Sequence, residues 1–326
     1  MADLGTKYLG LELKSPLIVG SSGLSNTVDE IRKCEKAGAG AVVLKSIFEE
    51  QITSEISKEI QSSNIDMHPE AAEYIQSVTR DRSVYQYLDL ITDSKKAVKI
   101  PVIASVNCVS ADGWLDFAAK IEKAGADALE VNVYIFDIEH RDDSKGIEER
   151  YLKILKAVKS AVKIPVALKI SNQFTNLSSI ARDLELHGVD GIVMFNRFLY
   201  NDINLDKMKV VQGRGVSSPD EFMIPLRWIG LLSPQLRIDL CASTGIHNGL
   251  DAAKLILAGA KAVQVTSALY LHKIEYLTEI TRQLNEWMDK NGYKSIHDMR
   301  GTLSAKDPSV SKMFSRFQYM KYIIER

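Results

Sequence analysis

The sequence predicts an α/β fold, a closed (β/α)8 barrel of the TIM type, from three observations. A unit in which an amphipathic helix ends at a glycine and a short apolar strand follows occurs four times, in residues 36–44, 123–131, 186–193 and 257–265. Apolar stretches between these units bring the candidate strands to eight. The GxGxxG turn that typifies open dinucleotide-binding sheets does not follow the first strand.

The glycine of each unit stands where a helix is expected to end. The left-handed conformation that closes a helix favours glycine, because a Cβ atom raises its energy. The strands are nearly continuous apolar runs, which is typical of a parallel sheet buried on both faces. Helical patterns follow the strands, and eight such pairs favour a barrel over an open sheet. The glycines are Gly38, Gly125, Gly188 and Gly259; the other strands are expected at residues 17–20, 101–106, 165–169 and 236–241, with helices such as 112–123 and 249–257.

Two insertions interrupt the alternation. Residues 49–99, mostly polar and compatible with a helix, separate strands two and three, and residues 197–218 follow strand six. Both leave the carboxyl-terminal face of the barrel, where active sites of this fold lie. The tail beyond Asn291 is predicted to be a surface helix without chemistry. We predict one domain over residues 1–326.

The composition is that of an ordinary globular protein. Forty-one Lys+Arg against forty-two Asp+Glu give a net charge of -1, which argues against a polyanion-binding protein and predicts no nucleic-acid partner. No apolar run approaches the ~18 residues of a membrane span, and the first residues do not read as a signal peptide. The three cysteines, Cys34, Cys108 and Cys241, are widely spaced, which excludes a disulfide framework and favours a cytoplasmic location. The six histidines show no HxH or HExxH spacing, so no metal site is predicted.

Polar side chains gather where the predicted strands end. If Lys45 and Lys169 served packing alone, each would need a nearby carboxylate, because an unpaired buried ammonium is costly. Polar groups that converge on one face of a barrel favour a ligand site instead. The set comprises Ser21, Ser22, Gly23, Lys45, Ser46, Asn107, Cys108, Asn132, Lys169, Asn196, Ser243, Thr244, Gly245, Thr266 and Ser267.

The last two strands add a pattern typical of phosphate binding. Residues 242–249 lead from strand seven into a helix, and residues 265–268 do so from strand eight. In this fold, loops at these two places often bind phosphate through backbone N–H groups at a helix start. Gly245 would let the backbone approach the phosphate closely. The pattern indicates a phosphorylated ligand or cofactor without specifying which.

These motifs together resemble the dihydroorotate dehydrogenase family, including the flavin domain of dihydropyrimidine dehydrogenase. Residues 16–23 resemble the family's opening strand and its Ala-Ser-Gly flavin turn, and residues 43–46 its Thr-Lys-Ser segment. Residues 125–132 are similar to the approach to its Glu-Leu-Asn-Leu-Ser-Cys-Pro-Asn motif. Residues 214–218, 243–246 and 266–269 resemble, in order, Gly-Gly-Val-Ser-Gly, Thr-Gly-Gly-Ile and Gly-Thr-Ala-Leu.

The resemblance implies FMN as the cofactor, a homodimer, and roles for individual residues. Lys169 is implied to stabilise negative charge on the reduced flavin ring. The phosphate is implied to lie on residues 215–218, 244–245 and 266–267. Lys45, Asn132 and Asn196 are implied to contact substrate. The implied cofactor-binding residues are Ser21, Ser22, Gly23, Lys45, Ser46, Asn132, Lys169, Gly215, Ser217, Ser218, Thr244, Gly245, Thr266 and Ser267.

Two departures from the family pattern fall on the substrate side. Residues 133–137 read Val-Tyr-Ile-Phe-Asp, so Ile135 stands where the family has a catalytic Cys or Ser, and isoleucine cannot transfer a proton. The family's substrate loop, Asn-Ser-Met-Gly-Leu-Pro-Asn, is not recognisable in residues 62–70. Positions that contact FMN are kept while positions that contact dihydroorotate are not.

A substitute base could be Tyr134, Asp137 or Cys108. A ring packed over the flavin or strand end is the alternative role for Tyr134, and Asp137 is expected to begin a solvated acidic run. A small buried thiol is the favoured interpretation of Cys108. His68 lies in the first insertion and is expected to be solvated, while His247 is expected to serve the turn before a helix.

The leading hypothesis is an FMN-dependent oxidoreductase similar to dihydroorotate dehydrogenase. It would transfer hydride between a dihydropyrimidine-like substrate and the flavin N5, with an altered substrate site. One alternative is a non-redox barrel enzyme that acts on a phosphorylated metabolite. The other is a flavin-binding subunit without turnover. No NAD or iron–sulfur site is visible, so electrons would pass to a partner subunit or by direct collision.

Overall fold

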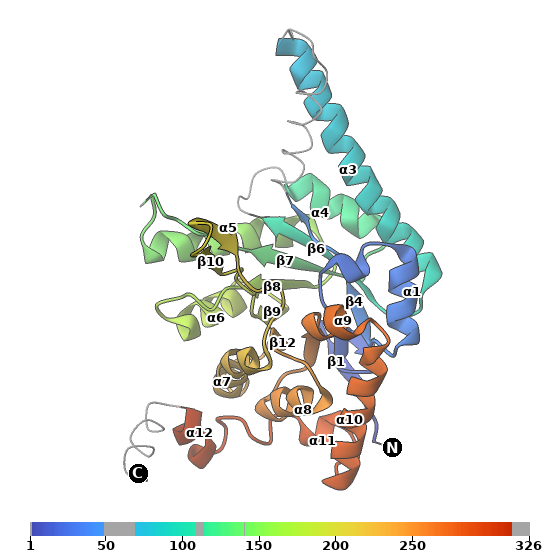
Figure 1. Cartoon of the computed structure of the whole chain (residues 1–326), viewed down its shortest axis with the longest axis vertical. Helices are drawn as coiled ribbons and strands as arrows, with labels where there is room; N and C mark the ends of the chain where they lie inside the picture. The colour runs from blue at the N-terminus through green and yellow to red at the C-terminus, as the bar shows by residue number, and fades with distance from the viewer. Residues whose placement is uncertain (1, 49–68, 109–113, 140, 315–326) are drawn as a thin grey trace.

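Eight parallel strands close into a barrel in the computed structural model, which describes residues 2–48, 69–108, 114–139 and 141–314 (Figure 1). Around the ring the strands run β3, β4, β6, β7, β8, β9, β12 and β13, and the pairing of β13 with β3 closes it. The predicted (β/α)8 barrel is therefore confirmed. The strands are β3 Leu17–Val19, β4 Ala41–Val43, β6 Val102–Cys108, β7 Ala128–Val133, β8 Val166–Ile170, β9 Gly191–Met194, β12 Asp239–Ser243 and β13 Ala262–Val265.

Helices cover the outside of the ring, one after each barrel strand (Figure 1). The expected helices at 112–123 and 249–257 correspond to α4 and α8, and the described part of α4 begins at Trp114. The helices are α1 Val28–Lys36, α3 Pro69–Ala97, α4 Trp114–Lys123, α5 Ser144–Ala161, α6 Leu177–Leu186, α7 Met223–Leu232, α8 Gly249–Ala258 and α10 Tyr276–Lys290.

The glycine of each repeated unit has a positive φ, as predicted. The φ angles are 94° at Gly38, 97° at Gly125, 83° at Gly188 and 123° at Gly259. In two of the units an aspartate follows two residues later and fastens the start of the preceding strand. Asp127 accepts from the N–H of Val102, and Asp190 from that of Val166, both at 2.7 Å.

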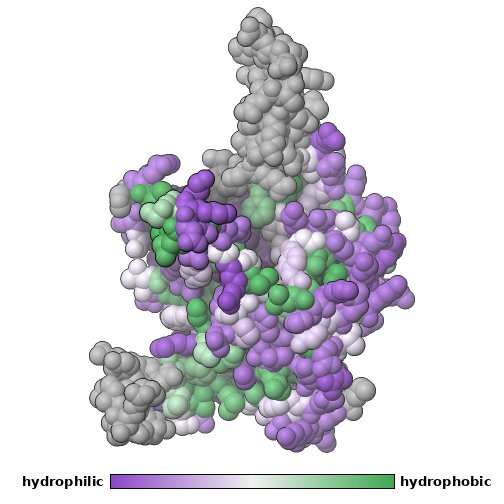
Figure 2. Space-filling view, viewed as in Figure 1, coloured by the Kyte–Doolittle hydropathy of each residue, from purple (hydrophilic) through white to green (hydrophobic). Residues whose placement is uncertain are grey.

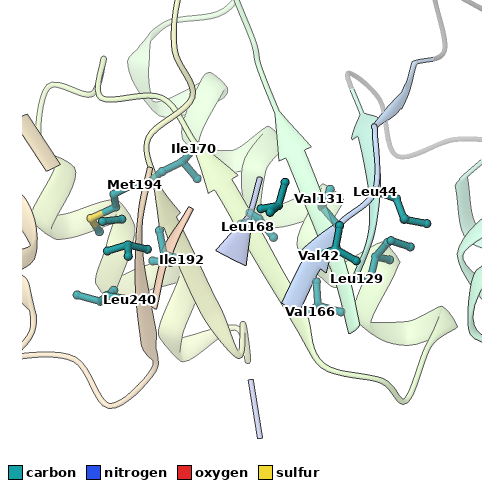
Figure 3. Packing of buried hydrophobic residues seen from close by; sticks show 14 of the residues in the cluster. Val42, Leu44, Leu129, Val131, Val166, Leu168, Ile170, Ile192, Met194 and Leu240 are labelled. Atoms are coloured by element: carbon teal, nitrogen blue, oxygen red, sulfur yellow. The ribbon is translucent and has the colours of Figure 1, made fainter. Parts of the chain in front are cut away.

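Two apolar layers stabilise the barrel. The outer layer lies between strands and helices and contains Leu129, Leu168 and Ile192, none of them exposed (Figure 3). The inner layer includes many small side chains. They leave space for a hairpin, β1 Thr6–Tyr8 and β2 Leu11–Leu13, whose Tyr8 and Leu9 fill the end of the barrel where the strands begin. The small residues of the inner layer are Ala41, Ala128, Ala167, Cys241 and Ala262.

Two sequence predictions were wrong in the carboxyl-terminal third of the chain. The seventh strand begins at Asp239 rather than at residue 236, because Gln235 and Leu236 donate back to Leu232 and close the end of α7. In its described part, residues 292–314, the tail beyond Asn291 is not one surface helix. It contains α11 Ile296–Met299 and α12 Pro308–Phe314, and Ile296 and Met299 are buried against α8 and α10.

Both insertions carry secondary structure of their own. The described part of the first is α3, whose amino-terminal half projects from the barrel while Tyr87 and Ile91 are buried against it (Figure 1). The second forms an exposed hairpin, β10 Asn201–Asn204 and β11 Lys209–Gln212. Hydrophilic residues cover much of the face in Figure 2, with apolar residues interspersed near this hairpin. Among the described residues, no helix is long and apolar enough to cross a membrane.

Gly188→Ala is expected to lower the free energy of unfolding by about 1–2 kcal/mol, because an L-residue there must adopt the left-handed conformation. No atom lies within 4 Å of the Cβ position, so the effect isolates the backbone cost. Gly188→Asn should cost less, since asparagine tolerates this conformation better. Urea unfolding followed by circular dichroism measures both variants. Equal losses for Ala and Asn would contradict this explanation.

Candidate functional site

A cavity of about 320 Å³ opens where the barrel strands end, within the usual size of small-molecule sites. It contains all the cofactor-binding residues that the resemblance implied except Ser218, together with the implied substrate residue Asn196. The lining comprises Ser21, Ser22, Gly23, Lys45, Ser46, Phe48, Asn132, Lys169, Phe195, Asn196, Arg197, Leu199, Gly215, Ser217, Ser243, Thr244, Gly245, Ile246, Gln264, Thr266 and Ser267.

Lys169 stands on the floor of the cavity and is buried. Its ammonium donates to Gln264 Oε1 at 2.8 Å and lies 3.7 Å from Glu130 Oε1. Each of the three residues belongs to a different barrel strand and points inward. Lys169 therefore has the nearby carboxylate that a buried lysine requires.

Lys45 differs from Lys169 in its surroundings. Among the described residues it has no acidic partner within salt-bridge distance, so its positive charge is available to an anionic or electron-rich group in the cavity. The adjacent Ser46 is held by hydroxyl contacts with Ser21 at 2.9 Å and Ser105 at 2.7 Å. Tyr87 of α3 accepts from the N–H of Ser105 at 2.7 Å, which ties this corner to the first insertion.

Two asparagines meet on another side of the cavity. Asn196, just after β9, donates through Nδ2 to Asn132 Oδ1 at 2.7 Å. The same nitrogen lies within 3.4 Å of the carbonyl oxygens of Val133 and Lys169. The contact fixes both amides at the ends of β7 and β9, beside Lys169. Such amides can pair with the N–H and C=O groups of a planar heterocycle.

Three segments far apart in the sequence converge at the remaining end. The N–H of Ser217 donates to Ser267 Oγ at 2.9 Å, and the N–H of Gly245 donates to Ser217 Oγ at 3.2 Å. Ser267 is the first residue of α9 Ser267–His272, which follows β13. Gly245 has φ 80°, and a Cβ there would lie 2.1 Å from the nitrogen of Phe222. Only glycine allows this close approach of the backbone.

His247 supports this end of the cavity from outside its lining, a role that the sequence did not indicate. Its ring Nε2 lies 3.2 Å from Ser217 Oγ, and its backbone N–H donates to Asp251 Oδ2 at 3.1 Å. Burial lowers the pKa of His247, and this outweighs the hydrogen bond with Ser217 and the charge of Asp251, which raise it. We expected His247 to serve the turn alone; instead its ring also fixes Ser217. Its position two residues after Gly245 was the available signal.

Ser218 lies outside the cavity lining and takes a different role. It precedes a short helix, η2 Pro219–Phe222, and its N–H donates to Glu221 Oε1 at 2.7 Å. Arg197 of the cavity wall donates to the same carboxylate at 2.9 Å and to the carbonyl of Arg214 at 3.0 Å. Burial raises the pKa of Glu221, but hydrogen bonds from Arg197 and Ser218 bring it below its usual value. The resulting clamp joins the end of β9 to the turn at residues 214–218.

Neither Tyr134 nor Asp137 lines the cavity. The ring of Tyr134 packs against Phe198 with centroids 5.0 Å apart, and burial raises its pKa. Asp137 accepts from the N–H groups of Asp142 and Glu139 within its own loop, and the first of these hydrogen bonds lowers its pKa. Both shifts disfavour a general base near neutral pH for these two residues. Ile135 between them packs against the outer apolar layer.

The third base candidate, Cys108, ends β6 opposite Val133 of β7, and its side chain lies outside the described residues. His68 lies outside them as well. Among the described residues, no group of three or more His, Cys, Asp or Glu side chains is placed to hold a metal ion.

The donor set of the cavity fits FMN. The linked segments around Ser217, Gly245 and Ser267 present hydroxyls and closely approaching backbone, which suit a phosphate group. Lys169 lies elsewhere in the lining, where an ammonium suits the electron-rich edge of a flavin ring. The asparagine pair also lines the cavity and presents amide groups that suit a polar substrate.

Comparison with known proteins gives a consistent result. The family model described as dihydroorotate dehydrogenase matches residues 3–288. The catalytic subunit of dihydroorotate dehydrogenase B (NAD+) from Thermoplasma volcanium is 28% identical over 92% of this chain and 98% of its own length. The dihydroorotate dehydrogenase A (fumarate) of Lactobacillus delbrueckii subsp. bulgaricus is 27% identical over 92% and 98%. The homologous catalytic subunit from Pyrococcus horikoshii is 27% identical over 91% and 97%.

The buried ring of His247 predicts a pH-dependent stability. Its pKa in the folded protein is below the unfolded value of ~6.5, so the unfolded chain binds an extra proton once the pH falls through that value. Stability is therefore retained above this pH and lost below it, at up to about 1.4 kcal/mol per pH unit from this group. Urea unfolding of flavin-free protein between neutral and mildly acidic pH measures the loss.

His247→Gln is the control for this prediction, because glutamine keeps a hydrogen-bonding group toward Ser217 but does not titrate. The variant should lose less stability than the wild type over the same pH interval. If both proteins lose the same amount, other groups cause the pH dependence.

Proposed function

The chain belongs to the dihydroorotate dehydrogenase family, and on that premise we propose that it is an FMN-dependent oxidoreductase. It would move a hydride between a dihydropyrimidine-like substrate and the N5 atom of the flavin. One observation carries the proposal: the residues implied to bind FMN line a single cavity at the strand ends, Ser218 excepted. Membership of the family alone would support the fold, whereas the shared cavity supports the cofactor.

The residues of this chain divide into a binding group and an orienting group. Ser217, Gly245 and Ser267 would hold the phosphate, and Lys169 would lie against the ring system. FMN supplies the hydride acceptor when bound. Asn132 and Asn196 would orient the substrate through its amide groups.

The substrate is proposed to differ from dihydroorotate. Ile135 replaces the usual base and packs against the outer apolar layer, while Tyr134 and Asp137 lie outside the cavity lining. Phe48 and Leu199 instead add apolar surface to the lining. A planar ring with amide groups and an apolar substituent suits these walls.

The partner that exchanges electrons with the flavin is proposed to be separate from this chain. The named acceptors of two relatives differ, NAD+ in one and fumarate in the other, so the family does not specify one. We also propose a homodimer, supported by the apolar side chains that the second insertion exposes. They include Leu205 and Met208, which are 77% and 82% exposed.

The cofactor proposal is tested by the visible absorbance of the purified protein and by titration of flavin-free protein with FMN. Gly245→Ala should weaken FMN binding at least about tenfold, because the new Cβ collides with Phe222 and the left-handed backbone is strained. Gly292→Ala is the matched control, since its φ of 75° carries similar strain outside the cavity lining. A wild-type protein that neither contains nor binds FMN overturns the proposal and favours a non-redox barrel enzyme.

Anaerobic mixing with a panel of dihydropyrimidines and nicotinamides tests the activity. At least one dihydropyrimidine should bleach the visible flavin band. A protein that binds FMN tightly but is reduced by none of them is a flavin-binding subunit, not an enzyme of this type.

Ile135→Cys alone is expected not to confer reduction by dihydroorotate. Ile135 packs against the outer apolar layer and does not line the cavity, so a thiol at this position is expected not to reach the substrate. The anaerobic bleaching rate with dihydroorotate measures the effect, with Ile135→Val as the control for packing. Rapid bleaching in the cysteine variant alone would show that the loop already presents this position to the ligand.

A further inference from the structure

Three polar side chains form a buried cluster beneath the cavity. Lys169 donates to Gln264 Oε1 at 2.8 Å, Gln264 donates through Nε2 to Glu130 Oε2, and the other Glu130 oxygen lies 3.7 Å from the Lys169 ammonium. Glu130 is 1% exposed, Gln264 2% and Lys169 8%. The contacts form a closed ring that joins β7, β8 and β13 across the barrel interior.

The three members do not share the same access to the ligand. Lys169 and Gln264 line the cavity, whereas Glu130 does not. Glu130 can therefore affect a ligand only through its two neighbours and through its charge. Its Oε1 atom accepts no hydrogen bond among the described residues, and Lys169 is the one described cation within salt-bridge distance of it.

Packing does not explain this carboxylate. The barrel interior offers this carboxylate little polar compensation: the inner layer contains Ala128, Ala167 and Cys241, and the hydroxyl of Ser105, its register partner on β6, is already bonded to Ser46. An ion pair in such a place is commonly no more stabilising than apolar residues of the same volume. Its retention at the floor of a ligand cavity points to control of the lysine.

We propose that Glu130 is a positioning residue that, with Gln264, holds the Lys169 ammonium at the cavity floor and partly offsets its charge. This rests on the proposed FMN site. The offset sets how strongly the site prefers reduced over oxidised flavin, because reduction places negative charge on the ring. Gln264 fixes the position of the ammonium relative to the carboxylate, because it accepts a hydrogen bond from Lys169 and donates one to Glu130.

The charges in this cluster determine the direction of each expected shift in the flavin midpoint potential. Removing the negative charge of Glu130 leaves the ammonium unbalanced, so reduced flavin should bind relatively more tightly and the midpoint potential should rise. Adding a negative charge at Gln264 should lower it. Removing a carboxylate at the other end of the barrel should leave the midpoint potential unchanged.

The test measures the FMN midpoint potential by dye equilibration in the full-length protein. Glu130→Gln should raise the preference for reduced flavin at least tenfold, which is about 30 mV for a two-electron couple. Gln264→Glu should shift it in the opposite direction. Asp239→Asn is the matched control: Asp239 is an inward carboxylate paired with Lys261 at 3.0 Å, at the opposite end of its strand from the cavity. The preference of this variant for reduced over oxidised flavin should stay within twofold of the wild-type value.

A second measurement needs no flavin. Lys169→Met should lower the melting temperature because it strands the Glu130 carboxylate in the apolar interior. Adding Glu130→Gln to that variant should recover part of the loss. If the double variant melts no higher than the single one, the pairing is overturned.

The outcomes separate this inference from the proposed function. A wild type that does not bind FMN overturns the proposed function, and the tuning role with it. FMN binding with less than a twofold change in Glu130→Gln overturns the tuning role only. If Glu130→Gln does not fold, Gln264→Glu decides: a lower preference for reduced flavin supports the inference, and an unchanged one overturns it.

Discussion

Closure of the barrel is the constraint on which the rest of the structure depends. Parallel pairing around the full ring fixes the height of every inward side chain relative to its neighbours, as in the register of Asn132 with Lys169. The ring also brings β13 next to β3, although about 240 residues separate them in the chain. Lys169 and Gln264 therefore meet because of strand register and not because of loop conformation, which keeps the cavity floor rigid.

The sequence was sufficient for the features that follow from local chemistry. Gly125 and Gly188 marked helix ends because the backbone there needs a positive φ. Polar residues such as Lys45 and Asn196 stood out at the ends of apolar strands, and the fold places them in one cavity. Glu130 was harder to interpret, because alternation along a strand gives the direction of a side chain but not its partner on a distant strand. The start of β12 was misjudged because Leu236 and Ile238 are apolar enough for a strand, yet Leu236 belongs to the turn that closes α7.

Different parts of the cavity tolerate substitution to different degrees. The end formed by Ser217, Gly245 and Ser267 depends on backbone approach and on hydrogen bonds between segments, so few substitutions fit there. Another part of the lining comes from residues beside the two insertions, such as Phe48, just before the first, and Leu199, within the second. Loops change with little cost to the barrel, which is consistent with the proposal that the cofactor residues are kept while the substrate side differs.

The amino-terminal hairpin has a consequence for the cavity at the other end of the barrel. Tyr8 and Leu9 fill the barrel base, and burial together with the charge of Glu130 raises the pKa of the Tyr8 hydroxyl. That hydroxyl lies close enough to the Glu130 carboxylate for the two groups to interact electrostatically, so the hairpin forms part of the dielectric environment beneath the cavity. Loss of the whole hairpin, unlike a single substitution that leaves Tyr8 and Leu9 in place, would open the barrel axis to water and would raise the dielectric constant around Glu130 without a change in any lining residue.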